Sequence, residues 1–114
     1  MSDTINLRVP GSRKKLRVST ASRWRSVMGL LGNRDLRDPH GMWVKSCRRI
    51  HTFGLIDKVD IVFLRADGVV AKVVTGMKPW RSTSCPEAST VFELRAGLAR
   101  RLNIAPGVAL DLLA

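Results

Sequence analysis

The chain has few aromatic, cysteine and acidic residues, and each shortage argues against some class of structure or function. It contains no tyrosine, three tryptophans and three phenylalanines, whereas strands that bind nucleic acid usually interleave aromatic with basic side chains. No run of about 18 apolar residues occurs, which excludes a transmembrane helix. The N-terminus lacks the basic and apolar regions of a signal peptide, so we expect a bacterial, cytoplasmic protein. There the two cysteines are expected to stay reduced.

Acidic residues are scarce relative to basic ones, with nine Asp and Glu against twenty Lys and Arg and a net charge of +11. Such a surface attracts nucleic acid, an anionic lipid surface or an acidic protein. An ordinary solvated surface explains the same charge, and we favour that interpretation because Trp24 is the only aromatic residue among the basic ones. Residues 1–26 hold Asp3 as their only acid and, as basic residues, Arg8, Arg13, Lys14, Lys15, Arg17, Arg23 and Arg25.

The length of 114 residues and the apolar content of 45% predict one domain. A chain of this size buries roughly two-thirds of its unfolded surface, which is enough for a single core. Residues 1–12 are polar and contain the breaker Pro10-Gly11, so we expect a flexible N-terminal arm over residues 1–12 and a single β-rich domain over residues 13–114.

Two segments have the pattern of short helices. The first follows Thr20, a good N-cap, and its apolar residues recur at the spacing of one helical face. The second covers residues 96–102 and has two basic residues in its last turn, where the helix dipole favours them. The apolar face of the first segment consists of Trp24, Val27, Met28 and Leu31.

Most of the remaining chain predicts β-strands. Residues 59–65 are almost continuously apolar, residues 69–75 are rich in β-branched side chains, and Asp67-Gly68 between them is a strong hairpin signal. Shorter strands are predicted over residues 13–19, 42–46, 50–53, 90–94 and 108–112, with an irregular segment over 76–86. We therefore expect a mainly β (β-rich α+β) fold, either a small antiparallel β-sandwich or a partly open barrel, with two short helices.

Cysteine and histidine offer three kinds of chemistry. Cys47, His51, Cys85 and His40 have the side chains of a zinc site, but their spacing lacks the tight C-x2-C pairs of such sites. Cys47 and His51 also form a candidate nucleophile–base pair, and Cys47 and Cys85 a possible thiol pair. A buried cysteine that packs as a small apolar residue is commoner, so we expect no metal and no cofactor.

Two carboxylates and one loop add further candidate residues for a polar functional site. Asp60 and Glu93 lie inside apolar strands, where a charge needs partners or a shifted pKa; the structural interpretation is that backbone N–H groups or arginines satisfy them. Trp80 and Arg81 stand in a loop where the indole either stacks on a ligand or covers the open end of the core. The chain has no Gly-rich phosphate loop and no G-x-S-x-G motif, so we expect no enzyme.

Several motifs follow one another in an order that carries a family resemblance. They include Gly41-Met42-Trp43-Val44, Ile50-His51-Thr52-Phe53-Gly54, Val59-Asp60-Ile61-Val62-Phe63-Leu64, Pro79-Trp80-Arg81 and Val91-Phe92-Glu93-Leu94. Together they resemble domain of unknown function family 192 over residues 16–113, with departures at Leu55, Lys58 and Val108. The resemblance implies a compact, mainly β fold and no established activity, cofactor or substrate. By analogy it also raises an accessory role in secretion or pilus assembly.

These observations lead to one main hypothesis and two alternatives. The main hypothesis is a non-enzymatic binding or accessory module with a polar cleft for a small ligand or a peptide end. The first alternative is binding of nucleic acid or an anionic surface through the basic patch Arg13, Lys14, Lys15, Arg17, Arg23 and Arg25. The second is a Cys–His thiol enzyme. The predicted ligand residues of the main hypothesis are His51, Thr52, Asp60, Trp80 and Arg81.

Overall fold

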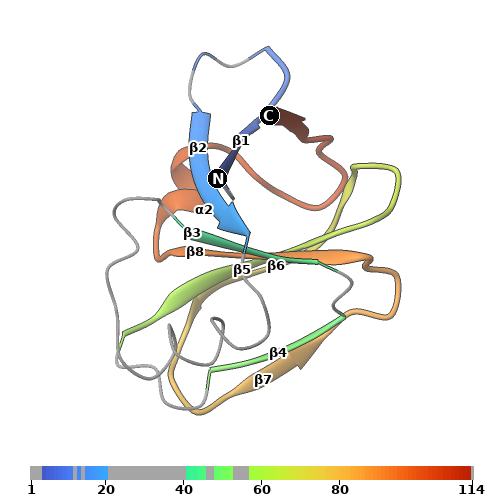
Figure 1. Cartoon of the computed structure of the whole chain (residues 1–114). Coiled ribbons are helices and arrows are strands. Elements are labelled where there is room, and N and C mark those ends of the chain that lie inside the picture. Colours follow the sequence, from blue (N-terminus) through green and yellow to red (C-terminus); the bar gives the residue numbers. More distant parts are fainter. Residues whose placement is uncertain are drawn as a thin grey trace.

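The computed structural model describes residues 4–11, 13, 15–20, 41–45, 48–52 and 57–113. These residues form a curled seven-stranded sheet, a separate two-stranded ribbon and a short helix, α2 (Leu98–Arg101) (Figure 1). The sheet is a half-barrel, so the partly open barrel is the predicted architecture that the structure adopts. Helix α2 confirms the second predicted helix, whereas the first, which follows Thr20, lies outside the described residues.

The order of the strands in the sheet differs from their order in the chain. All neighbouring strands are antiparallel except β2 and β3, which are parallel, so the predicted antiparallel arrangement holds for every other pair in this sheet. Parallel neighbours need a crossover of about a dozen residues or more, and residues 21–40 separate these two strands. In spatial order the strands are β6 (Val70–Met77), β5 (Val59–Leu64), β8 (Thr90–Arg95), β3 (Gly41–Lys45), β2 (Lys15–Thr20), β1 (Thr4–Arg8) and β9 (Asp111–Leu113).

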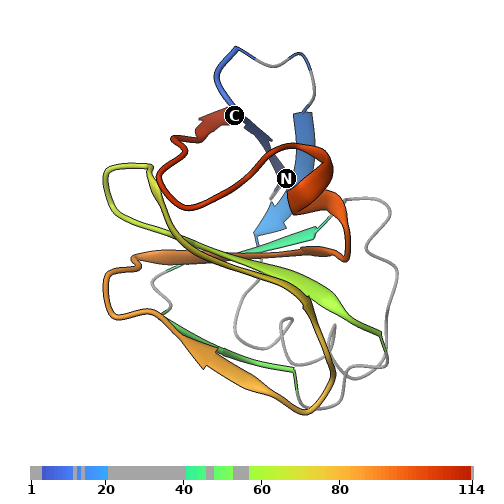
Figure 2. The same cartoon turned by 180° about the vertical axis from the view of Figure 1, so that it is seen from behind.

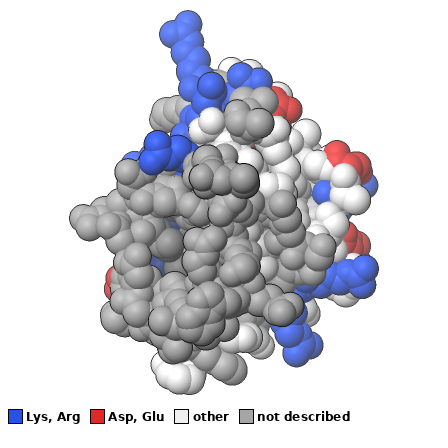
Figure 3. Space-filling model, in the orientation of Figure 1, with Lys and Arg blue, Asp and Glu red and all other residues white. Residues whose placement is uncertain are grey.

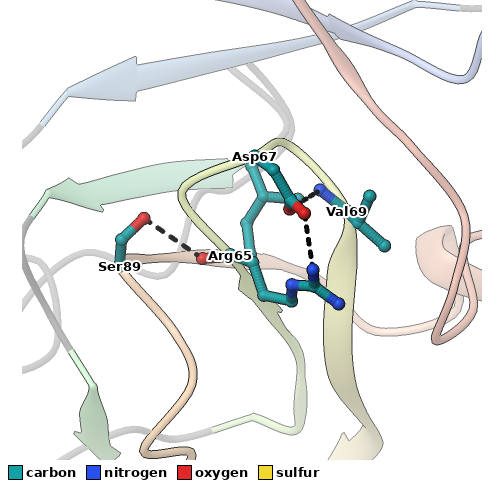
Figure 4. A network of polar contacts seen from close by, with 5 residues as sticks. Arg65, Asp67, Val69 and Ser89 are labelled. Atoms are coloured by element: carbon teal, nitrogen blue, oxygen red, sulfur yellow. Dashed lines mark hydrogen bonds and ion pairs between the residues drawn. The ribbon is translucent and has the colours of Figure 1, made fainter.

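The predicted hairpin of residues 59–75 is confirmed as β5 and β6. Gly68 has φ 87° in the turn, a conformation that glycine adopts without a steric penalty. Asp67 fastens the turn, because its carboxylate pairs with the Arg65 guanidinium and accepts a hydrogen bond from the Val69 N–H (Figure 4). The Ser89 N–H donates to the Leu64 carbonyl at 2.9 Å, which ties the hairpin to the chain that enters β8.

Side chains of the sheet form a core on each face. The first core lies between the sheet and α2 and includes Val62, Leu64 and Leu98. The second lies between the sheet and the ribbon of β4 (Arg49–His51) and β7 (Ser82–Ser84), and includes Ile61 and Cys85. Helix α2 and the ribbon are therefore on opposite faces of the sheet, as both views show (Figures 1 and 2). Strand β5 is buried on both faces because its side chains alternate between the two cores.

Strands β1 and β7 lie where no strand is predicted. Strand β1 belongs to the segment expected as a flexible arm, yet it pairs with both β2 and β9, and Leu7 is 1% exposed in the first core. The alternation of Ile5, Leu7 and Val9 explains this placement, since alternate residues of a strand point to one face. Strand β7 lies in the segment expected to be irregular and pairs with β4.

Gly41→Ala should lower the free energy of unfolding by about 2–3 kcal/mol. A Cβ atom at this position would lie 2.2 Å from the carbonyl oxygen of Glu93 on β8. Because the obstacle is the backbone of the paired strand, no side-chain rotation relieves the contact, and β3 and β8 would have to separate. Urea unfolding followed by circular dichroism measures the loss, with Thr75→Ala on the exposed face of β6 as the control. A change below about 1 kcal/mol would contradict this account.

Candidate functional site

A buried threonine organises the loop that carries Trp80. Thr52 directly follows β4 and is 0% exposed. Its N–H donates to the Arg81 carbonyl at 2.8 Å, and its own carbonyl accepts from the Trp80 N–H at 3.0 Å. Its hydroxyl donates to the Lys78 carbonyl at 2.7 Å and accepts from the Arg81 N–H at 2.9 Å. One side chain and its backbone therefore hold the loop of residues 78–81 in a single conformation.

This loop presents Trp80 to solvent. Its backbone lies in the left-handed region, with φ 64°, where a bulky residue is a rare exception. The side chain is 64% exposed, although burying an indole would be favourable. Strained residues of this kind cost about 1–3 kcal/mol and persist where the surroundings impose them. Here the hydrogen bonds of Thr52 impose the conformation, and the result is an ordered aromatic surface.

His51 is exposed on β4 beside this loop, Arg81 is exposed within it, and both lie among basic residues. His51 lies opposite Ser82 in the register of β4 and β7. Residues 48–52 and 77–84 contain no Asp or Glu, so the ribbon and its loop attract anions. The structure thus brings together His51, Trp80 and Arg81 around the buried Thr52. The exposed basic residues of these two segments are Arg48, Arg49, Lys78 and Arg81.

The structure does not bring Asp60, the fifth predicted ligand residue, to this cluster. Asp60 is 0% exposed and accepts hydrogen bonds from the N–H groups of Gly76, Gly97 and Ala99 at 2.8, 3.0 and 3.0 Å. Gly97 and Ala99 belong to the α2 side of the sheet, opposite the ribbon. These contacts support the structural interpretation of the sequence, in which backbone N–H groups satisfy a buried carboxylate.

Glu93 is the second buried carboxyl group, and it lies on the ribbon side of β8. In the sheet register it stands between Met42 of β3 and Ile61 of β5. Burial among these apolar neighbours raises the pKa of Glu93 to about 7. None of the described residues donates a hydrogen bond to it, so the arginine or backbone partner expected from the sequence is not found among them. Its neutral form is the one that the fold accommodates.

Of the residues in the predicted cysteine and histidine sites, the structure describes only Cys85 and His51. Cys85 is a buried free thiol whose Sγ donates to Glu87 Oε1 at 3.3 Å. Burial, followed by the contact with Glu87, raises the pKa of Cys85, which disfavours the reactive thiolate. Cys47 and His40 lie outside the described residues, so the thiol pair and the Cys–His dyad stay predictions. Among the described residues, no three His, Cys, Asp or Glu side chains are grouped to hold a metal ion.

The described residues of the basic patch lie at the end of the molecule away from the ribbon. Arg13, Lys15 and Arg17 are exposed on β2 and on the chain that leads into it. Figure 3 shows Lys and Arg side chains at this end, which is uppermost in the view. Lys14, Arg23 and Arg25 are outside the description of side chains. Within the part of the chain that the structure describes, no helix has the length and apolar character needed to cross a membrane.

Comparisons with known proteins support the family and the fold. The model of domain of unknown function family 192, described as Uncharacterized ACR, matches residues 5–112. A crystal structure of a proposed transcription regulator from Sinorhizobium meliloti 1021 has a TM-score of 0.80 and 22% identity, over 98% of this chain and 94% of that one. A protein of unknown function from Novosphingobium aromaticivorans DSM 12444 has a TM-score of 0.78 and 22% identity, over 95% and 83%. No curated protein matches the chain.

Proposed function

Since the chain belongs to domain of unknown function family 192, whose activity is uncharacterised, we propose a function from its own site. The chain is a non-enzymatic binding module, and the loop of residues 78–81 with strand β4 is its binding surface. The ligand is a small anionic molecule or the carboxylate end of a peptide. Trp80 is the platform on which the ligand packs, and Arg81 is the cation that receives its negative charge.

The exposure and conformation of Trp80 carry this proposal. A side chain that is 64% exposed gains little from folding, and its left-handed backbone costs free energy. The fold nevertheless ties the N–H of Trp80, and both the N–H and the carbonyl of Arg81, to Thr52. Holding a contact side chain in place before binding lowers the entropy lost when a ligand arrives. A binding role explains why the fold keeps an exposed indole on a strained backbone, whereas a covering role would require a buried indole.

The charge around the loop determines the class of ligand. A guanidinium presents parallel donors that match the two oxygens of a carboxylate, and Arg81 lies next to the platform in the chain. Arg49 and Lys78 add positive charge from the neighbouring strand and the start of the loop, with no acidic residue in either segment. Such exposed charges are screened by salt, so we expect affinity to fall as ionic strength rises.

Trp80→Gly should weaken ligand binding about tenfold without lowering stability. Glycine adopts positive φ readily, so the strain at this position disappears while the platform is lost. Titration of the full chain with a short peptide that has an apolar last residue and a free carboxylate, followed by nuclear magnetic resonance, measures the affinity. The same peptide with an amidated C-terminus tests the charge, and Arg81→Gln should remove the preference for the free carboxylate.

Leu112→Ala is the matched control, because Leu112 is another exposed apolar side chain, 39% exposed on β9, away from the ribbon. It should leave the affinity unchanged. The proposal would be overturned by peptide-induced shifts that avoid residues 48–52 and 78–82, or by a Trp80→Gly protein that binds as well as the parent. Marked destabilisation by Trp80→Gly would instead identify the indole as a structural cover.

A further inference from the structure

The hairpin of β1 and β2 has one apolar face and one basic face. The register pairs Leu7 with Leu16, and both side chains are buried in the first core. One residue away on each strand, Arg8 pairs with Lys15 and Asn6 with Arg17. Because alternate strand residues point to opposite faces, these four polar side chains share the face that does not enter that core. Strands β1 and β2 lie at the end of the molecule opposite the ribbon in both views (Figures 1 and 2).

The hairpin carries basic residues and no acidic residue of its own. Residues 4–20 contain five basic residues and no Asp or Glu. Arg8 pairs with Asp111 of β9 at 3.1 Å, so β9 compensates the basic residue nearest to it. The exposed residues beyond that pair are Arg13, Lys15 and Arg17. They place three exposed basic side chains on the described part of the hairpin.

The spacing of these side chains suits a polyanion with a regular repeat. Lys15 and Arg17 are two residues apart on one strand, which places their Cα atoms about 6.8 Å apart. One strand of duplex DNA carries a charge about every 3.4 Å along its axis, so its phosphates are dense enough to face both cations at once. The basic face includes no exposed aromatic or large aliphatic side chain among the described residues, and therefore offers neither base stacking nor insertion into lipid.

We propose that the basic face of the β1–β2 hairpin binds the phosphate backbone of duplex nucleic acid without reading its sequence. Lysine and arginine contacts to phosphates position a protein but carry no base information. This surface is separate from the Trp80 site and independent of the function proposed for it. Duplex is preferred to single strands because the described part of this face has none of the aromatic residues on which single strands stack.

The experiment measures binding of the full chain to a short fluorescent DNA duplex of random sequence by anisotropy at several salt concentrations. Lys15→Gln/Arg17→Gln should weaken binding about tenfold at low salt and reduce the slope of log affinity against log salt by about 2. The control, Arg100→Gln/Arg101→Gln, removes the same charge from exposed residues of α2 and should change the affinity less than twofold. Unchanged thermal melting shows that both variants fold.

Four results would overturn this inference. An equal loss in the α2 control would show that net charge alone drives binding. Stronger binding to polyglutamate than to DNA would assign the hairpin to an acidic protein, and stronger binding to vesicles rich in anionic lipid would assign it to a membrane surface. Binding that ignores salt would exclude phosphate contacts altogether, since these release counterions.

Discussion

Asp60→Ala should lower the free energy of unfolding by about 4 kcal/mol, the largest effect expected for a single substitution in this chain. The change removes a carboxylate that accepts three backbone hydrogen bonds, at 2.8, 3.0 and 3.0 Å. Hydrogen bonds to a charged group each contribute about 1.5–3 kcal/mol, and a buried donor left without a partner costs about 1–3 kcal/mol. Alanine would leave three such donors without a hydrogen-bond partner.

The three donors belong to different elements, so the loss of the Asp60 carboxylate should destabilise the whole fold. Gly76 belongs to β6, Gly97 precedes α2 and Ala99 lies within α2. One carboxylate on β5 thus joins the edge of the sheet to the helix that covers its core, and its loss should loosen both. Urea unfolding of Asp60→Ala, with the exposed Asp57→Ala as control, measures the difference. A loss below about 1 kcal/mol would show that water or a neighbouring group replaces the carboxylate.

Glu93→Gln should make the protein more stable above pH 7 by roughly 3 kcal/mol and change little at pH 4. The pKa of Glu93 is raised from 4.5 to about 7 because burial disfavours its charged form. The folded state therefore binds a proton that the unfolded state has already released between these two values. The stabilising contribution of the neutral carboxyl group is complete below pH 4.5, declines as pH rises, and is lost above about pH 7.

Glutamine has nearly the same shape and carries no charge, so it removes this dependence. The neighbours of Glu93 across the sheet, Met42 and Ile61, have no titratable side chain, and the nearest basic residue along β8 is Arg95. Urea unfolding of the parent and the variant between pH 4 and 8 gives the difference in stability, in which the titrations of other groups cancel. Parallel curves at all pH values would mean that the carboxyl group finds a partner when it ionises.

The parts of the fold that follow local patterns were predictable. Hairpin β5–β6 was recognised from an apolar run, a β-branched run and the turn residues between them, because all three signals act within a few residues. Strand β1 was missed although Ile5, Leu7 and Val9 alternate, since polar neighbours and Pro10 suggested an arm. Strand β7 carries no signal in Ser82, Thr83 and Ser84, and its pairing with β4 depends on residues some thirty positions away.

The candidate site, like the fold, was predictable from the sequence only in part. The motif around Trp80 and Arg81 was identified from its residue types, and His51 and Thr52 were placed beside it. Sequence patterns treated Thr52 as a ligand residue, whereas the structure buries it as the support of the loop. Asp60 was grouped with them because it follows closely in the chain. Alternation along β5 sends its side chain to the opposite face, and only the paired strands reveal which face that is.

The sequence by itself determined a mainly β fold, the central hairpin and the basic N-terminal region. It also identified the segment from His51 to Asp60 as part of the family resemblance and as a source of candidate ligand residues. These properties depend on composition, periodicity and turn chemistry, which are local. The tertiary structure decided that β2 and β3 are parallel, that β1 completes the core, and that Asp60 and Thr52 serve different faces of one sheet. Those outcomes depend on which distant strands pair and on the hydrogen bonds that satisfy buried polar groups, and neither is encoded in any short stretch of the chain.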